Sequence, residues 1–152
     1  MKLSDILTPE RVLIGVKEKD KNTILNSLVN KIGDLASIDN LDALRSEVME
    51  REALGNTGIG RGIGFPHAKS EHVHSLQALL ALPAKPIDYG SLDGVPVNII
   101  FFIVAPKDGD NNEYLHTMAR VSRFLGKNNV REQLLKAKTP EDVIDVVKSN
   151  EV

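Results

Sequence analysis

The chain has 152 residues, a formal net charge of −2, and 41% apolar and 26% charged residues, values typical of a single globular domain. This charge excludes the basic surface that nucleic-acid binding requires, and the absence of cysteine excludes disulfides, thiolate metal sites and a cysteine nucleophile. A charged N-terminal segment, and no apolar run near the roughly 20 residues of a membrane helix, predict a cytoplasmic protein that does not insert into membranes.

The first third of the sequence predicts a short N-terminal helix, a strand and two longer helices. The strand is expected over residues 12–16, where apolar residues run together. The first long helix has Asp20 as its expected N-cap, and Gly33 is expected to end it. The second is expected to begin near residues 39–40 and to continue its apolar pattern as far as Leu54.

The middle of the sequence predicts strands separated by turns. Glycines over residues 55–62 interrupt the helical pattern, and a short strand follows that Pro66 ends or confines to a sheet edge. Residues 75–84 are apolar enough for a buried strand, and residues 85–94 have the composition of a turn. The strongest strand signal is the β-branched and aromatic run over residues 95–106.

The last third predicts three helices. The first covers residues 111–126, and another follows over residues 129–138. The third has Thr139 as its cap, Pro140 at its first position and Asp142 completing a capping box. The element order predicts an α/β fold in which helices pack on a mixed sheet. The expected buried stripe of the first of these helices consists of Leu115, Met118, Ala119, Ser122 and Leu125.

Several functional patterns are absent or incomplete. The glycines near residue 60 do not fit a dinucleotide-binding fingerprint, and neither a P-loop nor a serine-hydrolase elbow is present. His67, His72, His74 and His116 raise the alternative of a metal-dependent hydrolase, and His72 and His74 would share one face of a strand. Their spacing matches no zinc pattern, so we expect no metal and no cofactor.

His67 is the strongest candidate for a catalytic residue. Pro66 stiffens the backbone before it, and glycines allow backbone N–H groups to approach an anion such as a phosphoryl group. The alternative is a tight turn that needs glycine for its own geometry. The glycines concerned are Gly58, Gly60, Gly62 and Gly64.

A second group of polar residues points to the same chemistry. His116, Arg120 and Arg123 share one face of the helix over residues 111–126, which is either an anion-binding surface or an ordinary solvated face. Arg51 precedes the glycines, and an arginine fork can hold two phosphoryl oxygens. Two histidines and an arginine indicate nucleophilic catalysis by histidine. With no nucleotide or Mg²⁺ pattern, the donor is expected to be a phosphoprotein rather than ATP.

The segment REALGNTGIGRGIGFPHAK, residues 51–69, resembles the active-site segment of the fructose/mannitol-type enzyme IIA domains of the bacterial phosphoenolpyruvate-dependent phosphotransferase system. That family includes the nitrogen-regulatory IIA proteins. The resemblance is carried by an Arg-Glu pair, a Thr-Gly-Ile-Gly run at residues 57–60 and Pro66-His67. A late Leu115-His116 pair is similar to the family's second histidine segment.

The resemblance implies a three-layer α/β/α sandwich with a mixed sheet, formed by residues 1–152 as one domain. His67 would be the phosphorylated nucleophile. His116 would hydrogen-bond or stabilise the phosphoryl group, and Arg51 would help to bind its oxygens or would shape the loop. The donor would be phosphorylated HPr or a related carrier, and the acceptor a cysteine of enzyme IIB. Alternatively, a nitrogen-regulatory IIA would act as a phosphorylation-dependent interaction module on a target protein. The implied phosphoryl-binding loop comprises Thr57, Gly58, Gly60 and Gly62.

Three positions depart from the usual family pattern. Gly64 and Phe65 stand before Pro-His where alanine and an aliphatic residue are usual, and Ala68 follows the histidine where glycine is common. We interpret these differences as tuning of the site. The missing cysteine means that the chain itself contains no phosphocysteine of enzyme IIB, so we expect a IIA unit that stands alone.

Overall fold

Six strands form one mixed sheet in the computed structural model, which describes residues 2–151. Its central pair, β5 and β6, is antiparallel, and β1 lies parallel to β5. On the other side of β6, β3 and β4 pair with it one after the other, both in parallel, and β2 pairs with β3. The strands are β1 (Val12–Val16), β2 (Gly58–Gly60), β3 (Ile63–Gly64), β4 (His67–Ser70), β5 (Gln77–Pro83) and β6 (Ile99–Pro106).

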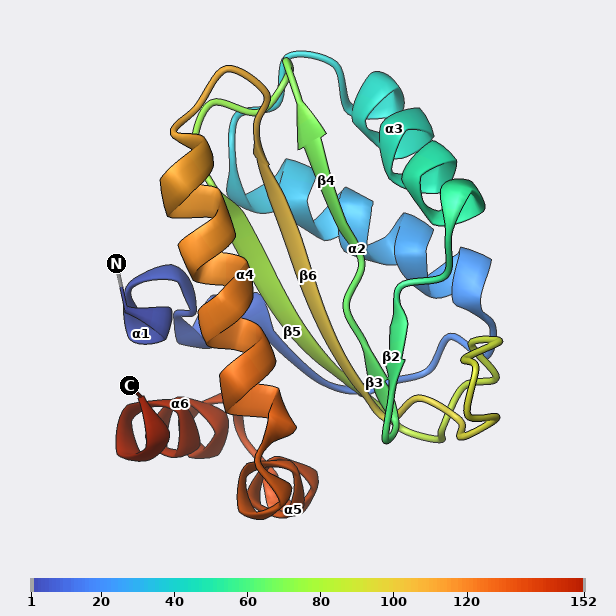
Figure 1. The fold of residues 1–152 in the computed structure, drawn as a ribbon, viewed down its shortest axis with the longest axis vertical. Helices are drawn as coiled ribbons and strands as arrows, with labels where there is room; N and C mark the ends of the chain where they lie inside the picture. The colour runs from blue at the N-terminus through green and yellow to red at the C-terminus, as the bar shows by residue number, and fades with distance from the viewer. Residues whose placement is uncertain (1, 152) are drawn as a thin grey trace.

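Helices cover both faces of this sheet. One core packs α2 and α3 against one face, and a second core packs α1, α4, α5 and α6 against the other. Figure 1 shows α4 in front of the sheet and α2 behind it. This arrangement confirms the predicted three-layer α/β fold. The helices are α1 (Leu3–Ile6), a 3₁₀ turn (Pro9–Arg11), α2 (Lys21–Leu35), α3 (Leu41–Leu54), α4 (Asn111–Gly126), α5 (Asn128–Lys136) and α6 (Pro140–Asn150).

Local sequence signals explain where the helices begin. Asp20 and Asn40 each accept a hydrogen bond from the backbone N–H three residues later, which satisfies an N–H left unpaired at a helix start. At α6, Thr139 and Asp142 exchange the two bonds of a capping box, with Pro140 at the first helical position. The predicted caps are therefore confirmed.

Two details of the predicted helices are wrong. Gly33 does not end α2, which continues to Leu35. A Cβ at Gly33 would lie 2.8 Å from Cδ2 of Leu41, so this glycine instead leaves room for the first turn of α3. Leu54 was expected in the apolar face of α3, but its side chain is 86% exposed.

Only part of the predicted stripe on α4 is correct, because the helix is rotated relative to that expectation. Leu125 is buried and Met118 packs against the core. Leu115, Ala119 and Ser122 are exposed. The observed orientation of α4 buries the ring of Phe124. This ring contributes a larger apolar area than Ala119 and Ser122, the small residues that were expected to be buried. The buried residues of α4 are Thr117, Val121, Phe124 and Leu125.

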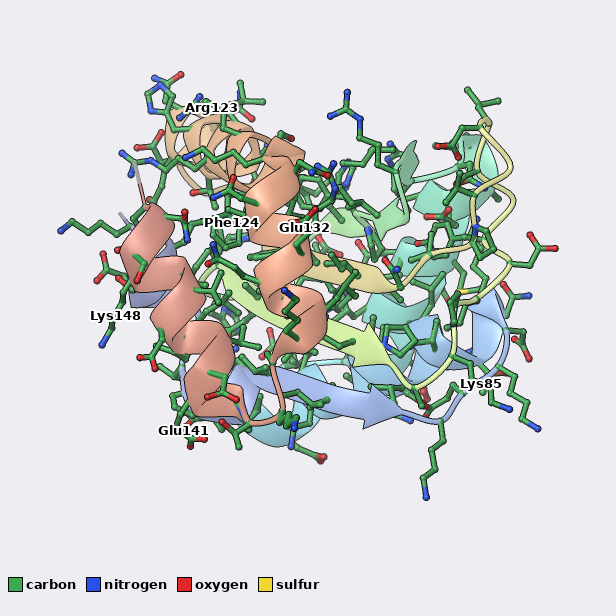
Figure 2. The ribbon with its side chains drawn as sticks, turned by 90° about the horizontal axis from the view of Figure 1, so that it is seen from below. Lys85, Arg123, Phe124, Glu132, Glu141 and Lys148 are labelled. Carbon is green, nitrogen blue, oxygen red and sulfur yellow. The ribbon has the colours of Figure 1, made fainter. Side chains whose placement is uncertain are left out.

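Two further helices extend the layer that α4 begins. Figure 2 shows α5 and α6 side by side, with Glu132, Glu141 and Lys148 labelled on them. These three charged side chains are exposed, while Val143 and Val147 of α6 are buried in the core. The helices therefore present the amphipathic pattern expected of an outer layer.

Pro66 interrupts the sheet without ending it. β3 stops at Gly64, and the carbonyl of Pro66 accepts a hydrogen bond from the N–H of Ile103 at 3.1 Å. The chain therefore stays beside β6 and resumes as β4, which pairs only with β6 among the described strands and so forms an edge. The edge was predicted, but the strand after Pro66 was not. His72 and His74 lie in the connection from β4 to β5, so they do not share one face of a strand as the metal alternative required.

Candidate functional site

His67 is the first residue of β4, at the exposed edge of the sheet. Successive side chains of a strand point to opposite faces. Ala68 packs in the core on the α2–α3 face, and Phe65 packs in the core on the α4 face. Strand alternation therefore directs His67 towards the α4 side, where its side chain is half-buried.

The backbone fixes which ring nitrogen of His67 can react. Nδ1 lies 2.8 Å from the carbonyl oxygen of Phe65. A carbonyl oxygen can only accept, so Nδ1 carries the proton and donates it. In the neutral ring Nε2 then holds the free lone pair, as a nucleophile requires.

A hollow of about 420 Å³ opens beside His67. Arg51 reaches it from α3, and one guanidinium nitrogen of Arg51 donates to the carbonyl of Gly55 at 3.0 Å. A guanidinium has five N–H donors, so this bond leaves others for a ligand. The lining residues are Glu47, Glu50, Arg51, Leu54, His67, Ala68, Lys69 and Tyr114.

Lys69 and Tyr114 are lining residues that the sequence analysis missed. The ammonium of Lys69 lies 4.7 Å from the centre of the Tyr114 ring and donates to the side-chain oxygen of Asn111. Burial raises the pKa of Tyr114, and nearby Arg51 opposes this rise, so the phenol stays protonated at neutral pH and can donate a hydrogen bond. Strand alternation places Lys69 on the face of His67, but Tyr114 comes from a distant helix.

The structure does not bring His116 to this hollow. Residues 114 and 116 are about 200° apart around a helix of 3.6 residues per turn. Because Tyr114 lines the hollow, His116 points away from it, and its side chain is exposed. His116 instead lines a separate depression along α4 with Asp110, Glu113 and Arg120.

This difference gives a matched pair of predictions. Replacing Tyr114 with phenylalanine removes one donor from the hollow, and we expect it to slow the phosphoryl transfer that the sequence predicts about 10- to 100-fold. Replacing His116 with alanine is expected to change the rate by less than about twofold, since exposed side chains away from a site contribute little. Rapid-quench measurement of both variants checks this. A slow His116 variant beside a normal Tyr114 variant would contradict the placement.

The glycine turn lies away from His67. Along β6, Ile63 pairs with Ile99 and His67 pairs with Ile103. Four residues of strand span roughly 13 Å, and Gly60 lies level with Ile63. None of Thr57, Gly58, Gly60 and Gly62 is among the described residues that line the hollow.

Contacts within the chain account for these glycines. Gly60 has a φ of 85°, and a Cβ there would lie 3.0 Å from Oδ2 of Asp93. That carboxylate accepts the backbone N–H of Arg61 at 2.8 Å. A Cβ on Gly58 would lie 2.2 Å from the hydroxyl oxygen of Ser91. The turn thus packs closely against the loop that contains Ser91 and Asp93, which favours the structural interpretation of the glycines.

The surroundings of His67 keep its ring neutral. Burial is the main cause that lowers its pKa below the ordinary 6.5, and the cation of Arg51 lowers it further. The bond to Phe65 and the charge of Glu52 act in the opposite direction. A neutral ring at physiological pH keeps the lone pair of Nε2 available.

The lowered pKa predicts how rate and stability depend on pH. Because the ring stays neutral, the rate of the phosphorylation that the sequence predicts for His67 should remain constant from about pH 8 to about pH 6.5 and fall only below that value. Stability should also fall as pH drops through 6.5 towards the lower folded pKa, since the unfolded chain binds the proton first. NMR titration of His67 and urea unfolding of the protein and of His67→Gln check this. A His67 pKa above 6.5 would contradict it.

The other histidines have acidic neighbours of their own. His74 lies 2.9 Å from Asp39, and His72 lies 3.7 Å from Glu71. Within residues 2–151, the structure shows no group of three or more histidine or acidic side chains that could hold a metal ion. Over the same residues, no helix combines the length and hydropathy needed to cross a bilayer.

Comparison with known proteins gives consistent matches. The family model "Phosphoenolpyruvate-dependent sugar phosphotransferase system, EIIA 2" matches residues 5–150. The chain is 30% identical over 151 residues to the Bacillus subtilis "PTS system fructose-specific EIIABC component", covering 99% of this chain but only 24% of that protein. It is also 30% identical over 147 residues to the "Nitrogen regulatory protein" of Bradyrhizobium diazoefficiens, covering 97% of this chain and 95% of that one.

Solved structures share the fold. The nitrogen regulatory protein IIA-Ntr of Neisseria meningitidis superposes with a TM-score of 0.88 at 21% identity, covering 95% of this chain and 98% of that one. Enzyme IIA-mannitol of Escherichia coli, in its complex with phosphorylated enzyme IIB-mannitol, superposes with a TM-score of 0.81 at 16% identity, over 95% and 98% of the two chains.

Proposed function

The chain belongs to the EIIA type 2 family of the phosphoenolpyruvate-dependent sugar phosphotransferase system, and from this premise we propose that it is a phosphocarrier whose nucleophile is Nε2 of His67. The observation that carries the proposal is the His67 ring itself. Its Nδ1 is bound to a backbone carbonyl, and its pKa is lowered, mainly by burial. The ring also borders a hollow that contains Arg51 and Lys69.

The proposed transfer needs no proton movement. The lone pair of Nε2 attacks phosphorus in line, and the bond from phosphorus to the donor nitrogen breaks with its electron pair left on the donor ring. The other nitrogen of the donor ring carries a proton, so that ring leaves as a neutral imidazole, and His67 takes up the positive charge. The proton stays on Nδ1 throughout and remains hydrogen-bonded to the carbonyl oxygen of Phe65. In onward transfer His67 is the leaving group. An acceptor thiolate attacks phosphorus, and the bond from phosphorus to Nε2 breaks with its electron pair left on Nε2. Arg51, Lys69 and Tyr114 offset the phosphoryl charge during both steps.

We propose phosphorylated HPr or a related phosphohistidine carrier as the donor and an enzyme IIB cysteine as the acceptor. The Bacillus relative is named as a fructose-specific component, and the mannitol structure is of a complex with phosphorylated enzyme IIB. We also propose that residues 1–152 act as one enzyme IIA domain, because the family match covers residues 5–150 and helices from both ends of the chain pack on the one sheet.

Mass measurement tests the carrier role. The protein is incubated with phosphoenolpyruvate, enzyme I and HPr, and separately with phosphoramidate, a small donor that needs no protein recognition. We expect a mass gain of one phosphoryl group that is lost in acid and kept in base, as for a phosphoramidate. Absence of any gain with either donor would refute the phosphocarrier role.

The second candidate function is that of a nitrogen-regulatory IIA, which signals by its phosphorylation state without passing the group to a sugar. It is favoured by the name of the Bradyrhizobium relative, which matches as well as the fructose relative does. Phosphorylation adds about −1.5 to −2 charges at neutral pH, enough to change affinity for a charged partner. Transfer from the phosphorylated protein to purified enzyme IIB of the fructose and mannitol types separates the two functions.

A further inference from the structure

Glu52 is a buried carboxylate beside the site, and the phosphoryl chemistry above does not use it. Its side chain is 6% exposed and forms an ion pair with Lys21 at the start of α2. It accepts the backbone N–H of Thr57 at 2.9 Å and the hydroxyl of Thr57 at 2.6 Å. Lys21 also lies 4.6 Å from the centre of the Tyr89 ring. Burying an ion pair is costly unless its remaining bonds are satisfied, and both oxygens of Glu52 have hydrogen-bond partners.

A continuous path of hydrogen bonds leads from this carboxylate to His67. The carbonyl of Thr57 accepts the N–H of Phe65 at 2.9 Å. The carbonyl of the same Phe65 accepts the proton of Nδ1 of His67 at 2.8 Å. Glu52 therefore holds residue 57, residue 57 holds residue 65, and residue 65 orients the imidazole.

We propose that Glu52, held by Lys21, is a positioning residue that fixes the ring orientation and the Nδ1–H tautomer of His67 through Thr57 and Phe65. The effect on rate rests on the proposed phosphocarrier function, whereas the effect on the tautomer does not. A carboxylate suits this task because charge-assisted bonds are stronger than neutral ones. Without them, Thr57 loses the two hydrogen bonds that tie it to α3. The Phe65 carbonyl would then be less firmly placed.

Nitrogen-15 NMR of the histidine rings reads the tautomer directly. Spectra are recorded on the unphosphorylated protein and on the variants Glu52→Gln, Lys21→Met and Lys21→Arg. Asp42→Asn is the matched control, because it removes one carboxylate from the same helix at an exposed position. Thermal unfolding of each variant shows whether it is folded. If Glu52→Gln does not fold, Lys21→Met tests the proposal in its place.

We expect His67 of the unchanged protein and of Asp42→Asn to show the Nδ1–H tautomer. Glu52→Gln and Lys21→Met should increase the Nε2–H fraction, and Lys21→Arg should restore the Nδ1–H form. Glu52→Gln should also slow phosphorylation by phosphoramidate about 10- to 100-fold, because small misplacement of a reacting atom has effects of this size.

Two outcomes would overturn the proposal. One is an Nε2–H tautomer in the unchanged protein. The other is an unaltered His67 tautomer in the folded Glu52 and Lys21 variants, even if their rates fall, because the residues would then act by another route. Failure of the unchanged protein to accept phosphoryl groups would refute the phosphocarrier function instead. The tautomer would still decide the role of Glu52.

Discussion

Replacement of His67 by alanine or glutamine is expected to abolish the acceptance of a phosphoryl group, from phosphorylated HPr and from phosphoramidate alike. Among residues 2–151, His67 is the only histidine that lines the hollow with Arg51 and Lys69. Glutamine is the better test, since its amide can donate to the Phe65 carbonyl but has no basic nitrogen. Intact-mass measurement of the two variants shows the loss directly.

The reverse experiment gives the sharpest control. The chain has four histidines, so a variant with His72, His74 and His116 all changed to glutamine keeps His67 alone. This variant should still gain one phosphoryl group, because the three removed rings are outside the His67 hollow. Full labelling of the His67→Gln protein, or no labelling of the triple variant, would refute the assignment of the nucleophile.

Replacement of Arg51 by methionine is expected to slow phosphoryl transfer about 100- to 1,000-fold, the usual effect of removing one donor aimed at developing charge. Arg51 holds the Gly55 carbonyl with one nitrogen and lines the hollow of His67. Lysine should recover only part of the rate, because an ammonium lacks the fork that binds two oxygens and the Gly55 carbonyl together. Single-turnover rates with phosphoramidate measure both variants.

Arg51→Met has a second, independent readout. The Arg51 cation lowers the pKa of His67, so its removal should move that pKa towards the ordinary value, which NMR titration can follow. Arg45→Met is the matched control on the same helix. Arg45 bonds to Asn26 and Asn30 of α2 rather than to the hollow, so both the transfer rate and the His67 pKa should remain unchanged. An unchanged rate in Arg51→Met would remove Arg51 from the mechanism.

The sequence by itself determined the starts of the main helices, the two central strands and the proposed nucleophile. Helix starts follow from the short-range chemistry of Asp20, Asn40 and Thr139, whose caps need only the next three residues. β5 and β6 follow from long apolar runs that no surface helix could present. His67 was proposed from a segment of neighbouring residues, and local sequence patterns carry this information.

Only the tertiary structure decided which side chains surround His67. Tyr114 rather than His116 lies beside it, because the rotation of α4 depends on how Phe124 and Val121 fill the core. That packing involves strands far away in the sequence, so helical spacing alone could not choose between the two faces.

The glycine turn was assigned to phosphoryl binding for a similar reason. Gly60 is close to His67 in the sequence, but the chain between them runs extended along β6. The positions of Ile63 and His67 on β6 are four residues apart, which is roughly 13 Å at about 3.3 Å per residue. The turn packs against Asp93, more than thirty residues later in the chain. Spacing along a chain determines local conformation, whereas proximity in the site depends on strand register and helix rotation, which long-range packing sets.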